Sequence, residues 1–152
     1  MLIPPFEGGC SCGSVRYRCD APPFVTYTCH CRDCQRATGS AFATCCQVPA
    51  EALHATGEPA SHERVADSGN RITTRFCARC GSALWIANAA RPRLRTLYIG
   101  TLDHPERADV DAHIWTKRRL PWVALPDHHR IFPEAGDWRP DYAAGPSRLE
   151  GA

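Results

Sequence analysis

Ten cysteines in a chain of 152 residues are the feature best able to carry chemistry, and seven of them gather in three short clusters. Thiolates at such close spacing are ligands that zinc prefers in proteins. Disulfides are the other common use of abundant cysteine, and they persist mainly in oxidising compartments. The clusters comprise Cys10 and Cys12, then Cys29, Cys31 and Cys34, then Cys77 and Cys80.

The third cluster has the clearest metal-binding spacing. Cys77 and Cys80 form a C-x-x-C turn, and Gly81 allows the chain to bend tightly around an ion. Such a turn needs two further ligands, which Cys10 and Cys12 can supply because glycines flank that pair. Four thiolates around one ion predict a closed, structural zinc site. Spacing alone leaves a second pairing open, in which Cys77 and Cys80 complete the middle cluster.

The middle cluster, Cys29, Cys31 and Cys34, then has no obvious fourth ligand. Zinc with three protein ligands and an open position is typical of a reactive site. Three thiolates leave the Zn²⁺ site with a net negative charge, which suits it to hold an incoming thiol as thiolate rather than to generate hydroxide. The alternative is a second structural zinc completed by His30 or another cysteine. Because His30 stands between two ligands, we expect its ring to point away from the ion.

The other candidate ligands have ordinary structural interpretations. His128 and His129 follow a Pro-Asp turn, so we expect a surface pair rather than a further metal site. His113 lies in an alternating run, where it either faces a cleft or is a hydrogen-bonded core histidine. The three remaining cysteines lie in strand-like runs and are expected to be small buried side chains: Cys19, Cys45 and Cys46.

The charge pattern argues against a nucleic-acid partner. The chain has 18 Lys and Arg against 16 Asp and Glu, a net charge of +2, which gives no strong electrostatic reason to bind nucleic acid. The basic run 117–119 is interpreted as a solvated turn. Three arginines near the clusters are candidates, by proximity alone, for binding substrate carboxylates: Arg32, Arg36 and Arg79.

The elements that position these residues are predicted to be mainly β-strands. Thirteen prolines and 11 glycines are spread along the chain, which disfavours long helices. Short helical turns are expected at residues 49–53 and at residues 31–38, the latter closed by Gly39. Strands are expected at residues 14–18, 41–48, 70–76, 83–86, 95–99 and 112–115.

The domain organisation is predicted to be simple. Residues 1–135 are expected to form one zinc-binding domain, and residues 136–152 a partly ordered or disordered extension. The first residues lack the basic and apolar regions of a secretory signal, and no run approaches the ~18 apolar residues of a membrane span. We therefore expect a cytoplasmic protein with no membrane association, in which reduced cysteines favour metal over disulfides.

The three clusters in this order resemble the glutathione-dependent formaldehyde-activating enzyme family, which is also named for centromere protein V. The resemblance is carried by Gly-Gly-Cys-Ser-Cys-Gly-Ser-Val-Arg-Tyr from residue 8, by Cys-His-Cys-Arg-Asp-Cys-Gln-Arg-Ala-Thr-Gly-Ser-Ala-Phe from residue 29, and by Arg-Phe-Cys-Ala-Arg-Cys-Gly-Ser-Ala-Leu-Trp from residue 75. Leu-Asp-His-Pro from residue 102, Ala-His-Ile-Trp from residue 112 and Pro-Trp from residue 121 extend it. The similarity covers about residues 6–133.

This resemblance implies a mainly β, Mss4-like (β-tent) fold and two zinc ions per chain. It implies an activity in which glutathione and formaldehyde combine reversibly to S-hydroxymethylglutathione, classed with the carbon–sulfur lyases. Glutathione would then be the co-substrate. The implied ligands are Cys10, Cys12, Cys77 and Cys80 for a structural zinc, and Cys29, Cys31 and Cys34 for a catalytic zinc.

Two other functions are compatible with the same residues. The open zinc can act on another small electrophile, for example by hydrolysing an imine. By analogy with centromere protein V, the chain can also be a non-catalytic, zinc-stabilised binding module. Salt-dependent binding of DNA at physiological ionic strength would favour this binding module over either enzyme.

Overall fold

The structure is a computed structural model that describes residues 2–66 and 69–135. In these residues it is mainly β, with one short α-helix and four single turns of 3₁₀-helix, which confirms the predicted class. The strands are Phe6–Gly9 (β1), Arg16–Cys19 (β2), Val25–Cys29 (β3), Ala43–Pro49 (β4), Leu53–Thr56 (β5), Ala60–Val65 (β6), Arg71–Phe76 (β7), Ala83–Asn88 (β8), Leu94–Tyr98 (β9), Ala112–Ile114 (β10) and Arg130–Ile131 (β11).

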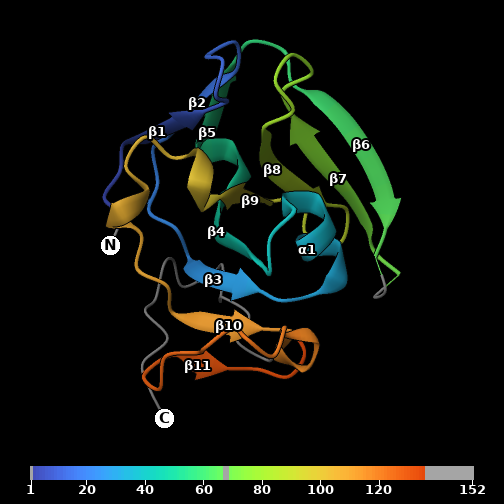
Figure 1. Cartoon of the computed structure of the whole chain (residues 1–152). Coiled ribbons are helices and arrows are strands. Elements are labelled where there is room, and N and C mark those ends of the chain that lie inside the picture. Colours follow the sequence, from blue (N-terminus) through green and yellow to red (C-terminus); the bar gives the residue numbers. More distant parts are fainter. Residues whose placement is uncertain (1, 67–68, 136–152) are drawn as a thin grey trace.

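The strands form two sheets (Figure 1). The small sheet has the order β1-β2-β5 and is antiparallel throughout. The large sheet has the order β11-β10-β3-β4-β9-β8-β7-β6. Most of its neighbours are antiparallel, but β10 runs parallel to both β3 and β11. This parallel pairing brings the C-terminal part of the described chain beside the strand that ends at Cys29.

The two faces of the large sheet bury separate cores. Successive side chains of β4 point to opposite faces, so Cys45 and Cys46 enter different cores. Cys46 packs with Tyr17 and other residues of the small sheet, whereas Cys45 packs with Tyr27 and with the middle cysteine cluster. Cys19, Cys45 and Cys46 are all at most 2% exposed, which confirms their prediction as packing residues.

The helix α1, Arg32–Thr38, begins immediately after Cys31 and confirms the predicted turn. Cys31 is its N-cap, with its sulfur accepting a hydrogen bond from the Cys34 amide, and Gly39 ends it in the left-handed conformation at φ 65°. The other expected turn is the 3₁₀-helix Ala50–Ala52 (η1), which follows Pro49. Three further 3₁₀ turns are Ile99–Thr101 (η2), Pro105–Arg107 (η3) and Thr116–Arg118 (η4).

The six expected strands are present, with bounds shifted by up to two residues. The strands that were not predicted from the sequence include β6. It is an edge strand whose sequence, Ala-Ser-His-Glu-Arg-Val, is mostly exposed and has no clear alternation of apolar residues. They also include β3, which is buried along its whole length and therefore has no alternation to detect. The predicted extension at residues 136–152 lies outside the described residues. Within the described part of the chain, no helix is both long and apolar enough to cross a membrane.

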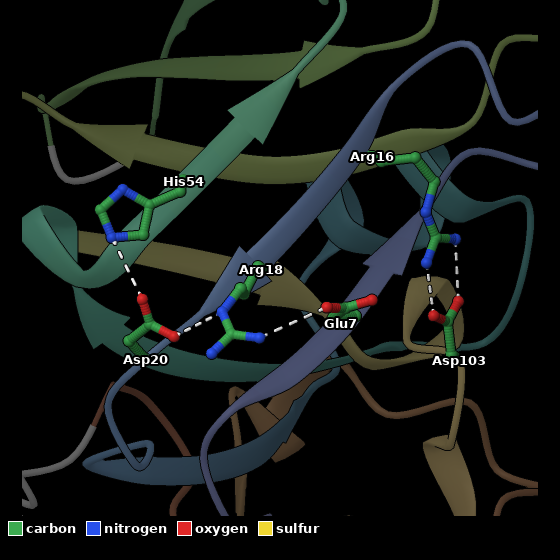
Figure 2. Close-up of polar contacts among 6 residues, drawn as sticks. All are labelled: Glu7, Arg16, Arg18, Asp20, His54 and Asp103. Atoms are coloured by element: carbon green, nitrogen blue, oxygen red, sulfur yellow. Dashed lines mark hydrogen bonds and ion pairs between the residues drawn. The ribbon is translucent and has the colours of Figure 1, made fainter.

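Exposed ion pairs cross the outer side of the small sheet (Figure 2). Arg16 donates two hydrogen bonds to the Asp103 carboxylate, which joins β2 to the segment after η2 and lowers the pKa of Asp103. A second chain of contacts links Glu7 and Asp20 to Arg18, and Asp20 to His54. Because these side chains are exposed, each pair contributes only about 0.2–1 kcal/mol to stability.

Candidate metal centres and an adjoining cleft

The first and third cysteine clusters meet in space. The sulfurs of Cys10, Cys12, Cys77 and Cys80 all lie within 4.8 Å of one another. The Cys10 and Cys12 sulfurs are 3.6 Å apart, and those of Cys12 and Cys77 are 3.7 Å apart. A tetrahedral ion with Zn–S bonds of ~2.3 Å separates its sulfurs by about 3.8 Å, so the observed spacing fits zinc and is too long for a disulfide. The structure thus favours the pairing of these four and excludes the pairing of Cys77 and Cys80 with the middle cluster.

Two glycine turns shape this four-cysteine site. The turn between β1 and β2 ends at Gly13, whose amide donates to the Cys10 carbonyl at 3.0 Å. The turn between β7 and β8 ends at Gly81, whose amide donates to the Cys77 carbonyl at 2.8 Å. Both glycines have φ near +77°, a conformation that other residues adopt only with strain. The structure therefore confirms that these glycines allow the tight bends that the sequence predicted beside the cysteines.

Serine hydroxyls surround the sulfurs, and the sequence analysis missed them. The Ser14 hydroxyl lies 3.0 Å from the Cys12 sulfur and 3.2 Å from the Cys77 sulfur. Hydrogen bonds from Ser11 and then Ser82 lower the pKa of Cys80 to about 5. Hydroxyl donors at this range stabilise the thiolate form that a metal requires. The signal available in the sequence was that serines lie within two residues of a cysteine ligand in both clusters.

The middle cluster forms a second group of thiols at the end of β3 and the start of α1. The sulfurs of Cys29, Cys31 and Cys34 lie within 4.8 Å of one another, and among the described residues no fourth ligand joins them. Cys29 is buried, whereas Cys31 and Cys34 are half-buried. The strand places Cys29, and the helical cap places Cys31 three residues before Cys34, so all three sulfurs face one point.

Contacts among the three thiols shift their pKa values in opposite directions. Hydrogen bonds from Cys29 and then Cys34 lower the pKa of Cys31 to about 2. The pKa of Cys29 rises because it hydrogen-bonds to Cys31 and is buried. For Cys34, the hydrogen bond with Cys29 lowers the pKa. The contact of Cys34 with Cys31 and the burial of its side chain outweigh this effect and raise the pKa to about 12. A set of thiols that hydrogen-bond to one another in this way suits a divalent cation, which would displace the remaining thiol protons.

His30 turns away from this group, as expected. Its side chain is fully buried, and its Nε2 lies 3.0 Å from Nδ1 of His113. His113 in turn contacts Nδ1 of His129 through its own Nε2 at 2.9 Å. His113 is therefore a hydrogen-bonded core histidine, and burial lowers its pKa to about 4. The expectation of a surface pair holds for His128 but is wrong for His129, because β11 draws His129 back against β10.

A cleft of about 730 Å³ adjoins the middle cluster, and Cys31 forms part of its wall. Its floor is the face of the large sheet that carries the second core, from β3 across to β7. Its rim is formed by α1, by β6, by the turn between β8 and β9, and by η4. The floor residues are Tyr27, Gln47, Ile72, Ile86 and Thr96.

The rim of the cleft is strongly basic. Of the arginines proposed from sequence, Arg32 and Arg36 line it, whereas Arg79 is not among the lining residues. Lys117 and Arg118 from the basic run are exposed, as predicted for a solvated turn, but they also line the cleft, which the sequence analysis missed. Among the described residues, the charged side chains that line the cleft are Arg32, Arg36, Arg64, Arg91, Lys117 and Arg118, against the one carboxylate of Asp33.

Comparisons with known proteins agree with this architecture. Residues 5–118 match the family described as glutathione-dependent formaldehyde-activating enzyme. A curated protein from Halomonas elongata, provisionally named as such an enzyme, is 30% identical over 132 residues, which cover 78% of this chain and 80% of the relative. A crystal structure of a Rhodobacter sphaeroides protein superimposes with a TM-score of 0.52 at 15% identity, covering 83% of this chain and 98% of that one.

The family match extends over most of the chain and includes all seven clustered cysteines. The structural likeness covers nearly the whole of the Rhodobacter protein and supports the fold independently of close sequence similarity. Together with the two thiol groups, these findings confirm the expected Mss4-like, mainly β fold. This chain belongs to the family of glutathione-dependent formaldehyde-activating enzymes.

Proposed function

We propose that the protein is a zinc-dependent enzyme of the carbon–sulfur lyase type. It would form or cleave the adduct of formaldehyde, or a related aldehyde, with glutathione or a related anionic thiol. The observation that carries the proposal is the three-cysteine group, which opens through Cys31 onto a basic cleft. The name of the Halomonas relative supports the same reaction.

The two thiol groups would have different tasks. Cys10, Cys12, Cys77 and Cys80 would hold a zinc that ties the β1–β2 turn to the β7–β8 turn. Cys29, Cys31 and Cys34 would hold a second zinc. When bound there, zinc lowers the pKa of a substrate thiol and keeps it as a nucleophilic thiolate.

The reaction itself needs little from the protein beyond positioning. In the forward direction the substrate sulfur forms a bond to the carbonyl carbon. The carbonyl oxygen becomes a hydroxyl, and the proton that this oxygen gains is, in the net reaction, the one that the thiol loses. The reverse reaction breaks the same carbon–sulfur bond. The basic rim would hold the anionic body of the thiol so that its sulfur reaches Cys31's end of the cleft. We also propose a cytoplasmic location, because such thiolate sites require reducing conditions.

The proposal is tested by the rate of interconversion between thiol and hydroxymethyl adduct at equilibrium. NMR exchange with ¹³C-formaldehyde measures this rate with glutathione and with other anionic thiols. The zinc-loaded protein is expected to exceed the uncatalysed rate, and Cys31→Ser is expected to return the rate to background. Absence of acceleration with every thiol, in protein carrying both zinc ions, would favour the binding-module interpretation instead.

A further inference from the structure

We infer that the cleft selects a thiol more anionic than glutathione, namely one whose body carries phosphate ester groups and no ammonium near the thiol arm. This inference rests on the proposed function, since it names the substrate class for the same site. Its basis is the imbalance between the guanidinium groups of the rim and the carboxylates available to them.

The single carboxylate that lines the described part of the cleft is already used. Asp33 accepts a hydrogen bond from Arg64 at 2.6 Å, and both side chains are about one-third exposed. Lys117 pairs with Glu134. Four cationic lining residues have no acidic partner within residues 2–66 and 69–135: Arg32, Arg36, Arg91 and Arg118.

Glutathione matches this charge pattern poorly. It carries two carboxylates and one α-ammonium, so it would leave some of the four guanidinium groups without an anion. Its ammonium would find no free carboxylate among the described lining residues, because Asp33 is held by Arg64. A positive group placed in a basic cleft is repelled by its surroundings.

Phosphate esters match it well. Each carries close to two negative charges, and guanidinium groups bind phosphate oxygens in bidentate fashion. The four guanidinium groups come from three segments of the chain: Arg32 and Arg36 from α1, Arg91 from the β8–β9 turn, and Arg118 from η4. Cys31 lines the same cleft as these guanidinium groups.

The size of the cleft also favours a larger thiol. Its volume of 730 Å³ lies in the upper half of the range of about 300–1,000 Å³ that pockets for drug-sized ligands span. A flexible thiol arm with phosphates at its far end uses both the length of the cleft and the charges at its edge. Coenzyme A has this chemistry and serves as the probe.

The experiment compares the dissociation constants of coenzyme A and glutathione by calorimetry on zinc-loaded protein. We expect coenzyme A to bind at least tenfold more tightly, with a steeper dependence on salt. Arg36→Gln and Arg91→Gln should each weaken its binding about tenfold, as expected for loss of a charged hydrogen bond. Arg93→Gln is the matched control, because Arg93 is exposed on the same turn as Arg91 and does not line the cleft.

Equal or tighter binding of glutathione, or equal losses in Arg91→Gln and Arg93→Gln, would overturn the inference. A Co²⁺-substituted protein separates this failure from failure of the proposed function. If either thiol perturbs the cobalt absorption, thiol coordination stands whatever the selectivity. If adenosine 3′,5′-bisphosphate displaces coenzyme A and coenzyme A leaves the cobalt spectrum unchanged, the selectivity for phosphate stands and the thiol chemistry does not.

Discussion

Replacement of Cys77 by serine should distinguish a folding site from a reaction site. The Cys77 side chain is 1% exposed, and its sulfur lies 3.7 Å from that of Cys12 and 3.2 Å from the Ser14 hydroxyl. Cys77→Ser removes one of the four sulfurs that join two turns far apart in the sequence. The same change at Cys31 removes one sulfur from the group that opens onto the cleft.

The expected magnitudes differ greatly. Structural zinc contributes an apparent free energy of about 10–16 kcal/mol in zinc-finger peptides at neutral pH. A whole domain is stable by only about 5–15 kcal/mol, so loss of that ion is sufficient to unfold it. Cys77→Ser should therefore be largely unfolded at 25 °C. Cys31→Ser should remain folded, because its neighbours Cys29 and Tyr27 keep their packing in the second core.

The assay combines zinc content with thermal unfolding followed by circular dichroism. Cys31→Ser should lose one zinc and the exchange activity while keeping a cooperative transition. Cys46→Ser is the matched control, since Cys46 is fully buried but belongs to neither group, and it should keep both zinc ions. Equal destabilisation by Cys31→Ser and Cys77→Ser would refute the assignment of different tasks to the two groups.

Three further changes test other parts of the structure. Gly57→Ala should lower the free energy of unfolding by about 3 kcal/mol and weaken zinc retention at the four-cysteine site, because φ is +78° and a Cβ would lie 2.1 Å from the Ser14 carbonyl oxygen; denaturant unfolding and metal analysis check this. Burial lowers the pKa of His113 to about 4 in the folded state, so below its usual pKa of ~6.5 the unfolded state binds the proton more readily than the folded state. The free energy of unfolding should therefore fall by about 1–2 kcal/mol between pH 7 and pH 5. This decrease should be smaller in His113→Asn. Asp33→Asn should release Arg64 and tighten the binding of an anionic thiol severalfold, which calorimetry measures; weaker binding would show that the Asp33–Arg64 pair supports the cleft instead.

The two thiol groups were largely predictable because their signals are local. The C-x-x-C and C-x-C spacings with their glycines indicated the turns. The need for four ligands favoured the pairing of Cys10 and Cys12 with Cys77 and Cys80, but spacing left the second pairing open until the structure brought these four sulfurs together. The helical cap at Cys31 and the glycine at its end were equally readable, because capping depends on neighbouring residues.

The cleft and the histidine chain were not predictable, because both depend on contacts between distant segments. Arg64, Arg91 and Arg118 come together only when the large sheet places β6, the β8–β9 turn and η4 around one face. The contact of His30 with His113 requires the parallel pairing of β10 with β3, which no local pattern encodes. The basic run at 117–119 was correctly expected to be exposed, but the position of Lys117 and Arg118 on the rim of the cleft is a property of the fold.

The most direct test of the account is metal counting combined with titration of a thiol. The Co²⁺-substituted protein should carry two metal ions per chain, in keeping with one group of four thiols and one of three. Addition of an anionic thiol should change the absorption of one ion only, and that change should disappear in Cys31→Ser. A single bound ion, or two ions whose spectra both ignore the thiol, would contradict the claim that the three-cysteine group is an open site for thiol chemistry.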